Sequence, residues 1–306
     1  MKAFPLAALL VAMMAGSVVS AADAPPPAAP AGPPRDAWRE VNPDNLLLIQ
    51  TRYGTVAVEL APEFAPNHAA RMHKLTAAHF YDGKTFYRVV DGFVAQGGIG
   101  EDEEAEGGAK GNDARNTKWP PLKAEFDRPE GKDITFTPLG NPDLFAPEVG
   151  HVDGFPVGHD PADHRYWLLH CPGTFAFARD NDDDTATTEF YIVIGQAPRR
   201  LDRNLTAFGR VIDGMQYLQK LNRGDADVDI GVIQDKAQRD PIVSMKFASD
   251  LPAKDRPQYW VLKTESPFFA DLKDKRRHPS PEFYHRPPLA DLDVCSVPVT
   301  VRKTAP

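Results

Sequence analysis

Cysteine, excess basic charge and long apolar runs are all scarce in this sequence. Only two cysteines occur among 306 residues, too few for a disulfide-rich scaffold or a four-cysteine zinc site. Lysine and arginine total 35 against 43 aspartates and glutamates, which gives a net charge of −8. A protein that binds the phosphate backbone is usually basic, so we expect no nucleic-acid partner. No run of 18 apolar residues lies beyond the N-terminus, so we expect no internal membrane span.

Proline, in contrast, is abundant. The chain has 30 prolines, roughly twice the usual share, and this indicates many loops. Hydrophobic residues make up 42% and charged residues 25% of the chain, values typical of globular proteins. The length suits one large domain or two average ones, and no internal repeat is visible.

The N-terminus has the pattern of an export signal. Lys2 supplies a positive charge, residues 8–15 are apolar, and small residues follow where a signal peptidase could cut. We therefore predict a signal peptide over residues 1–22, followed by a Pro/Ala-rich linker over 23–43. This predicts an exported protein, either periplasmic or fully secreted.

Short strand-like runs separated by turn residues dominate residues 44–249. Helical spacing occurs twice, once after Pro66 and once after Asp213. Many short strands with only two helices favour an all-β closed barrel. The predicted strands are 46–49, 56–60, 86–90, 93–96, 174–178, 190–194, 207–212 and 241–247.

Two segments depart from this pattern. Residues 128–170 are rich in proline and histidine with little periodicity, so we predict a loop-rich insertion. Residues 250–306 are aromatic, basic and proline-rich, and we predict a C-terminal extension that packs on the barrel. Cys171 and Cys295 could pair in an oxidising compartment. The sequence leaves both the paired and the unpaired state open, because it does not give their separation in space.

One ordered set of motifs resembles a known family. Residues 86–98 (FYRVVDGFVAQGG) resemble the cyclophilin-type peptidyl-prolyl cis/trans isomerase signature, aromatic-x-Arg-(Ile/Val)2-x-Gly-Phe-x-x-Gln-Gly-Gly. Residues 173–179, 186–192 and 208–211 match further family blocks in order, most like the exported bacterial branch. The resemblance covers 44–249 apart from the insertion. It implies an eight-stranded antiparallel barrel capped by two helices, and an isomerase of X-Pro bonds that assists the folding of exported proteins without a cofactor.

The resemblance also implies the residues of the site. Arg88 and Gln96 match the catalytic pair, in which the glutamine orients the arginine. Bond rotation needs no nucleophile and no metal. A fixed guanidinium can donate to the prolyl nitrogen as it becomes pyramidal, and so binds the transition state better than the planar ground state. The residues expected to contact substrate are Phe93, Val94, Ala178, Arg179, Glu189, Tyr191 and Leu201.

Three departures from the family pattern keep an alternative open. Arg200 stands where many eukaryotic members have tryptophan, Leu205 where they have histidine, and Glu189 replaces a glutamine. These changes favour a proline-peptide-binding chaperone or scaffold with little turnover. Under either hypothesis the partners are proline-containing unfolded or partly folded polypeptides, and we expect a monomer. The clients and the preferred residue before proline stay open.

A histidine-rich stretch suggests a third hypothesis. Histidine and carboxylate side chains suit zinc and other transition metals. Their spacing here matches neither a helical pair nor a zinc finger, so we favour a surface loop over a metal-dependent enzyme. The residues concerned are His151, His159, Asp160, Asp163, His164, His170 and Cys171.

Overall fold

The computed structural model describes residues 32–100 and 118–306, and Pro33–Pro306 forms one compact unit. The predicted signal peptide lies outside the described residues. The first barrel strands are Leu46–Thr51 (β2) and Gly54–Leu60 (β3), which pair as the expected hairpin. Gly54 has φ of 145°, and a Cβ there would lie 2.4 Å from the Tyr217 ring, so this turn requires glycine.

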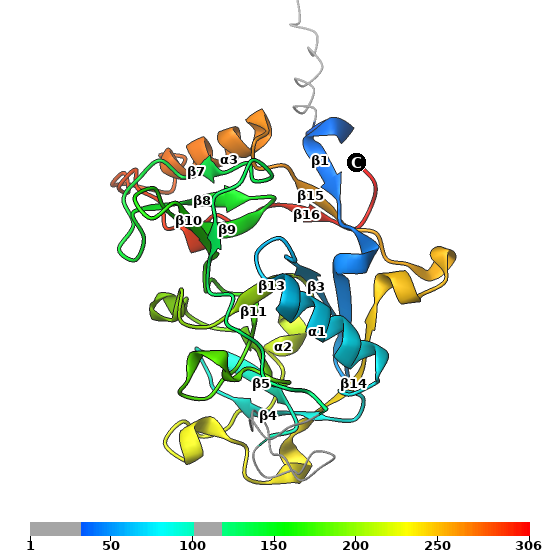
Figure 1. Ribbon diagram of the computed structural model, residues 1–306. Coiled ribbons are helices and arrows are strands. Elements are labelled where there is room, and N and C mark those ends of the chain that lie inside the picture. Colours follow the sequence, from blue (N-terminus) through cyan, green and yellow to red (C-terminus); the bar gives the residue numbers. More distant parts are fainter. Residues whose placement is uncertain (1–31, 101–117) are drawn as a thin grey trace, which may run out of the picture. The chain divides into compact units, whose positions relative to one another are not determined.

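Eight antiparallel strands close into a barrel in the order β11-β12-β5-β4-β14-β2-β3-β13 (Figure 1). Phe175 and Phe177 lie in the interior core, whereas Ala176 between them belongs to a second cluster on the outside. This alternation is that of strands with one face in a core. The predicted closed eight-stranded barrel is confirmed. Its other strands are Thr85–Val89 (β4), Val94–Gly98 (β5), Thr174–Phe177 (β11), Phe190–Val193 (β12), Ala207–Asp213 (β13) and Asp240–Phe247 (β14).

The two predicted helices are Pro66–Ala77 (α1) and Met215–Leu218 (α2), and both add side chains to the barrel core. A third helix, Pro267–Arg277 (α3), was not predicted, although Ser266 caps it by accepting from the Phe269 amide. Within residues 32–100 and 118–306, no helix is both long and apolar enough to span a membrane. Short 3-10 turns cover Arg35–Ala37, Pro43–Asn45, Asp183–Thr185, Arg199–Leu201, Asp229–Gly231, Lys236–Gln238, Ala248–Asp250, Ala253–Asp255 and Val294–Ser296.

The insertion is a sheet, which corrects the prediction of a loop-rich segment. Five antiparallel strands follow the order β6-β10-β9-β8-β7. Figure 1 shows this green sheet beside the orange helix α3. Its strands are Arg128–Pro129 (β6), Thr137–Pro138 (β7), Glu148–Val152 (β8), Phe155–Asp160 (β9) and Arg165–Leu168 (β10).

Burial on both faces explains why the insertion lacks the alternation of a strand. Trp167 packs into the cluster that contains the tail, while its neighbour Leu168 packs into the cluster against the barrel wall. A sheet covered on both sides needs no polar face, so the two-residue period disappears. The sequence contained one local signal of a hairpin, the pair Asp153-Gly154. These residues form the two-residue turn between β8 and β9, with φ of 47° and 86°.

The two chain ends of the described unit share a second small sheet. Trp38–Glu40 (β1), Trp260–Leu262 (β15) and Val301–Arg302 (β16) pair in the order β1-β15-β16. The segment predicted as the linker 23–43 therefore ends in a strand. Trp38 is buried in the cluster of the tail, and this burial holds the strand in place.

A buried charge cluster fastens the insertion to the barrel. Glu59 of β3 pairs with Arg39 at 2.5 Å and with Arg210 at 3.0 Å. Both arginines also donate to backbone carbonyls of the β8–β9 turn, Arg39 to Asp153 and Arg210 to Gly154. Each charge thus has partners of opposite sign or hydrogen-bond acceptors, as buried charges require.

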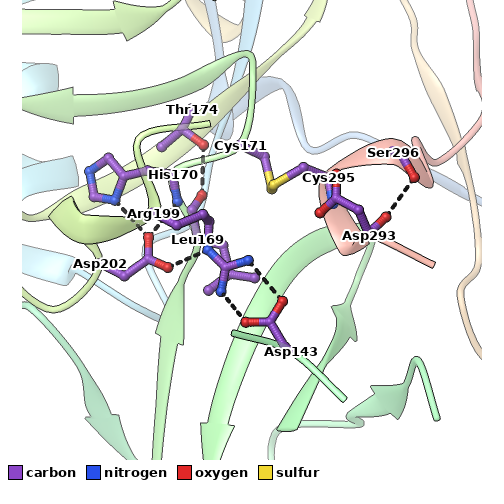
Figure 2. The surroundings of a disulfide bond; sticks show 10 residues. All are labelled: Asp143, Leu169, His170, Cys171, Thr174, Arg199, Asp202, Asp293, Cys295 and Ser296. Carbon is purple, nitrogen blue, oxygen red and sulfur yellow. Dashed lines mark hydrogen bonds and ion pairs between the residues drawn. A yellow bond between two sulfur atoms is a disulfide. The ribbon is translucent and has the colours of Figure 1, made fainter. Parts of the chain in front are cut away.

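Cys171 and Cys295 form a disulfide, with Cα atoms 5.1 Å apart (Figure 2). The bond joins the end of the insertion to the tail across 124 positions of sequence. The question that the sequence left open is answered in favour of pairing.

Burial of His151 makes the stability of the protein depend on pH. Its ring meets that of Phe269 in α3 at 5.0 Å between centroids. Burial, together with the positive charges of Arg210 and Lys273, lowers the pKa of His151 from 6.5 to about 3. The stability that neutral His151 contributes is present above pH 6.5 and is lost as the pH falls from 6.5 towards 3. We predict that between these limits the free energy of unfolding falls by about 1.4 kcal/mol per pH unit more in the wild type than in His151→Gln.

Urea unfolding measured from neutral pH down to about pH 4 tests this prediction for His151. The exposed His285 supplies a matched control, and His285→Gln should keep the wild-type slope. Equal slopes for the wild type and His151→Gln would contradict it.

Candidate active site

A cavity of about 160 Å³ lies on the outer face of the barrel. Eight of the nine residues that the sequence assigned to the site line it, and Glu189 is the exception. Leu205 is an additional lining residue. The lining consists of Arg88, Phe93, Val94, Gln96, Ala178, Arg179, Tyr191, Leu201 and Leu205.

Strand register brings the polar and aromatic centres together. Arg88 of β4 stands opposite Gln96 of β5, and Gln96 stands opposite Tyr191 of β12. Side chains directly opposite each other on paired strands emerge on the same face. Three residues from distant parts of the sequence therefore form one row across the sheet.

The guanidinium of Arg88 is held from two sides. Its Nη1 donates to Oε1 of Gln96 at 3.1 Å, and its Nε donates to the carbonyl of Ile230 at 2.9 Å. The Phe93 ring centroid lies 5.9 Å from the guanidinium carbon. A planar fork fixed at two nitrogens has a defined direction, which is what a donor to a transition state needs.

The loop that carries Ile230 contributes to the site, although the sequence does not point to it. Asp229 and Ile230 adopt φ of 48° and 49°, a conformation that β-branched residues rarely adopt. The following residues hold the loop against β4, where Ile233 donates its amide to the Tyr87 carbonyl at 2.8 Å. No sequence signal marks Ile230, because its contribution is a backbone carbonyl.

The side chain of Gln96 is oriented by a hydrogen bond to Tyr87. Its Nε2 donates to the Tyr87 hydroxyl at 2.5 Å, and this hydroxyl bonds to the Glu189 carboxylate. Since a carboxylate only accepts, Tyr87 donates to Glu189 and accepts from Gln96. The Oε1 atom of Gln96 is then the one turned towards Arg88.

Glu189 requires a correction, because it does not line the cavity. The residue is 2% exposed, and its carboxylate accepts from the amides of Ile99 at 2.9 Å and Gly100 at 3.4 Å. Burial raises the pKa of Glu189, while these donors oppose the shift. A Cβ on Gly98 would lie 2.4 Å from this carboxylate. The side chain therefore packs beneath the end of β5, where it supports the site without facing substrate.

The rest of the cavity is mainly apolar. Phe93, Val94, Tyr191, Leu201 and Leu205 provide a surface of the kind that holds a small ring. Val94 and Tyr191 are buried beneath it in the cluster that also contains the insertion sheet. The insertion thus packs directly behind the cavity floor.

Arg179 is engaged by neighbouring loops. Its Nε donates to the Asn204 carbonyl and its Nη2 to the Asn204 side chain, both at 3.0 Å. Ala178 continues from β11 and donates its amide to the Glu189 carbonyl at 2.8 Å. Both residues form the rim of the cavity.

Two of the residues that depart from the family pattern, Leu205 and Arg200, lie differently with respect to the cavity. Leu205, which the resemblance places where eukaryotic members have histidine, lines the cavity itself, whereas Arg200 is exposed and is not a lining residue. Neither change removes a contact of Arg88.

The histidine-rich stretch is dispersed over the insertion. His159 pairs with Glu148 and Glu130, His170 pairs with Asp202, and His151 is buried against α3. The described ranges, 32–100 and 118–306, contain no group of three side chains placed to hold a metal ion. The favoured surface loop is wrong for His151, His159 and Asp160, which lie in strands β8 and β9. Asp163 and His164 do lie in an exposed turn, between β9 and β10.

Removal of the Tyr87 hydroxyl should weaken catalysis moderately. Tyr87→Phe leaves the Gln96 amide and the Glu189 carboxylate without one partner, and a hydrogen bond of this kind contributes about 1 kcal/mol. We predict a decrease of about fivefold in kcat/KM with the fold intact. The test compares proline-peptide isomerisation by Tyr87→Phe and by Tyr217→Phe, which removes a hydroxyl away from the cavity. Equal rates for both variants would contradict the role of Tyr87.

The chain is similar to several known proteins. Residues 46–247 match the family model described as "Cyclophilin type peptidyl-prolyl cis-trans isomerase/CLD". A probable peptidyl-prolyl cis-trans isomerase of Brucella suis is 26% identical over 214 residues, covering 68% of this chain and 85% of that protein. Peptidyl-prolyl cis-trans isomerase B of Bacillus subtilis is 27% identical over 177 residues, covering 58% and 90%.

The similarity extends to a solved structure that spans more than the barrel. The cyclophilin AquaCyp293 from Hirschia baltica superposes with a TM-score of 0.67 at 30% identity, covering 87% of this chain and 92% of that one. Family model, relatives and barrel all agree. The chain belongs to the cyclophilin family of peptidyl-prolyl cis-trans isomerases.

Proposed function

We propose that this isomerase acts on X-Pro bonds of polypeptides outside the cytoplasm and thereby assists the folding of exported proteins. The observation that carries the chemistry is the guanidinium of Arg88, held by Gln96 and the Ile230 carbonyl beside an apolar cavity. The catalytic and binding roles given to individual residues are part of this proposal.

The proposed mechanism is bond rotation under a fixed donor. Resonance opposes rotation of a peptide bond by about 18–20 kcal/mol. With the proline ring against Phe93 and Tyr191, the twisting bond lies next to Arg88. The nitrogen regains its lone pair as it becomes pyramidal and accepts a hydrogen bond that the planar ground state accepts poorly. The donor therefore stabilises the transition state selectively.

Two features support a location outside the cytoplasm. The Cys171–Cys295 disulfide is a bond that persists in oxidising compartments and is rare in the cytosol of mesophiles. The composition of residues 1–22 is typical of a signal peptide.

Expression in a Gram-negative host tests the location. We expect the full chain in the periplasmic fraction, with an N-terminus near residue 23 and with both cysteines oxidised. A chain without residues 1–22 should stay in the cytoplasm with free thiols. An uncleaved full chain in the cytoplasm would overturn the proposal.

An isomerisation assay separates the enzyme from the alternative of a binding chaperone. Arg200, Leu205 and Glu189, which favoured that alternative, leave the contacts of Arg88 intact. We therefore expect the purified protein to accelerate cis-trans exchange in a tetrapeptide with one Ala-Pro bond. Binding of the peptide without acceleration would favour the chaperone.

A further inference from the structure

A buried polar chain begins at Tyr191 of the cavity floor and runs through His170, Asp202, Arg199 and Asp143; Figure 2 shows the last four of these residues. His170, fully buried where the insertion returns to the barrel, places its Nε2 2.8 Å from the Tyr191 hydroxyl. Its Nδ1 lies 3.0 Å from Oδ1 of Asp202, and its backbone amide donates to the same oxygen at 2.8 Å. The floor residue Tyr191 is thus joined to an element outside the barrel.

The chemistry of the groups sets the direction of these bonds. The Asp202 carboxylate only accepts, so Nδ1 of His170 carries the proton and donates. In the neutral ring Nε2 then has a lone pair, and it accepts from the Tyr191 hydroxyl. Burial raises the pKa of Tyr191, so the hydroxyl keeps the proton that it donates.

The same aspartate also holds the cavity wall. Its Oδ2 lies 2.5 Å from Nε of Arg199, and Arg199 pairs in turn with Asp143 at 3.0 Å. Arg199 opens the short turn that carries Leu201, and the Asp202 amide donates to the Arg199 carbonyl to close it. One carboxylate therefore joins the wall residue Leu201 to the histidine behind Tyr191.

The neighbours of His170 in the sequence hold its backbone in place. Cys171, the next residue, forms the disulfide with Cys295, and the Thr174 hydroxyl donates to the Leu169 carbonyl at 2.7 Å. Leu168 packs in the same cluster as Tyr191. The position of His170 is thus set by the insertion and the tail.

We propose that His170 is a positioning residue of the isomerase, which holds the Tyr191 ring directly and the Leu201 turn through Asp202, at the spacing that receives a proline ring. This rests on the proposed function, because it assumes that these two side chains bind substrate. The bonds of Arg88 to Gln96 and Ile230 do not involve His170, Asp202 or Tyr191, so loss of the polar chain weakens binding of the ring and leaves these bonds of the donor in place. We expect an increase in KM with little change in kcat.

The test is a double-mutant cycle on the full, oxidised chain with a tetrapeptide that contains one Ala-Pro bond. We expect His170→Leu to raise KM about tenfold, with kcat within about twofold of the wild type. In a Tyr191→Phe background, which keeps the floor ring, the same substitution should have a clearly smaller effect. Equal effects in the two backgrounds would overturn the proposal.

One control variant and the Tyr191→Phe single variant keep the outcome interpretable. His159→Leu removes another buried histidine of the insertion, one paired with Glu130 and Glu148, and should leave KM unchanged. If His170→Leu does not fold, Tyr191→Phe alone decides, because an unchanged KM there would refute the role of the hydroxyl contact. An inactive wild type would refute the proposed function, whereas an active wild type with an insensitive KM would refute this inference alone.

Discussion

Arg88→Ala should lower kcat/KM by at least about 100-fold, or roughly 2.7 kcal/mol of transition-state stabilisation. The substitution removes the donor that faces the twisting bond. It should leave the fold intact, because Arg88 lies on the outer face of β4 and the core beneath it is made by Phe86 and Val89. Arg88→Lys should be nearly as damaging, since a point-like ammonium cannot reproduce the planar fork whose separate nitrogens reach Gln96 and Ile230.

The measurement is proline-peptide isomerisation together with circular dichroism. Arg200→Ala is the matched control, because Arg200 is an exposed arginine close to Leu201 that does not line the cavity. It should retain activity within about twofold. Unchanged activity in Arg88→Ala would remove this residue from the mechanism.

Loss of the disulfide should produce the largest change in stability. Cys171 and Cys295 close a loop across 124 positions, and closing a loop of that order in the unfolded chain contributes about 3–5 kcal/mol. We therefore predict that Cys171→Ala/Cys295→Ala loses about this much free energy of unfolding. The physical reason is that the unfolded chain regains the freedom of the insertion and tail relative to each other.

Chemical denaturation with and without a thiol reductant tests this prediction. Reductant should bring the wild type close to the double variant and should leave the double variant unchanged. Coincident unfolding curves for the oxidised wild type and the double variant would show that the crosslink does not contribute.

Most of the cavity lining could be predicted because it lies in contiguous motifs. Residues 86–98 contain the arginine, the glutamine and two floor residues on two strands joined by a tight turn. Residues placed by one such hairpin keep a fixed spacing in the sequence, and this spacing can be recognised. Glu189 shows the limit, because the same motif matching placed it in the groove while packing under Gly98 turned it inward.

The insertion could not be predicted in the same way. Its strands are covered on both faces, by the tail on one side and by the barrel wall on the other, so no polar face marks their period. Only the Asp153-Gly154 turn carried a local signal.

Motif order and strand spacing thus predicted the closed barrel, its two helices and a site that contains Arg88, Gln96 and two aromatic side chains. The disulfide, the sheet of the insertion and the contacts of His170 with Tyr191 and Asp202 became visible only in the folded structure. The disulfide and the two contacts of the His170 ring join positions 21 to 124 residues apart. A hydrogen bond or a disulfide forms only between atoms that are close in space. Residues this far apart in sequence become close only when the chain between them has folded, so local sequence patterns do not reveal such pairs.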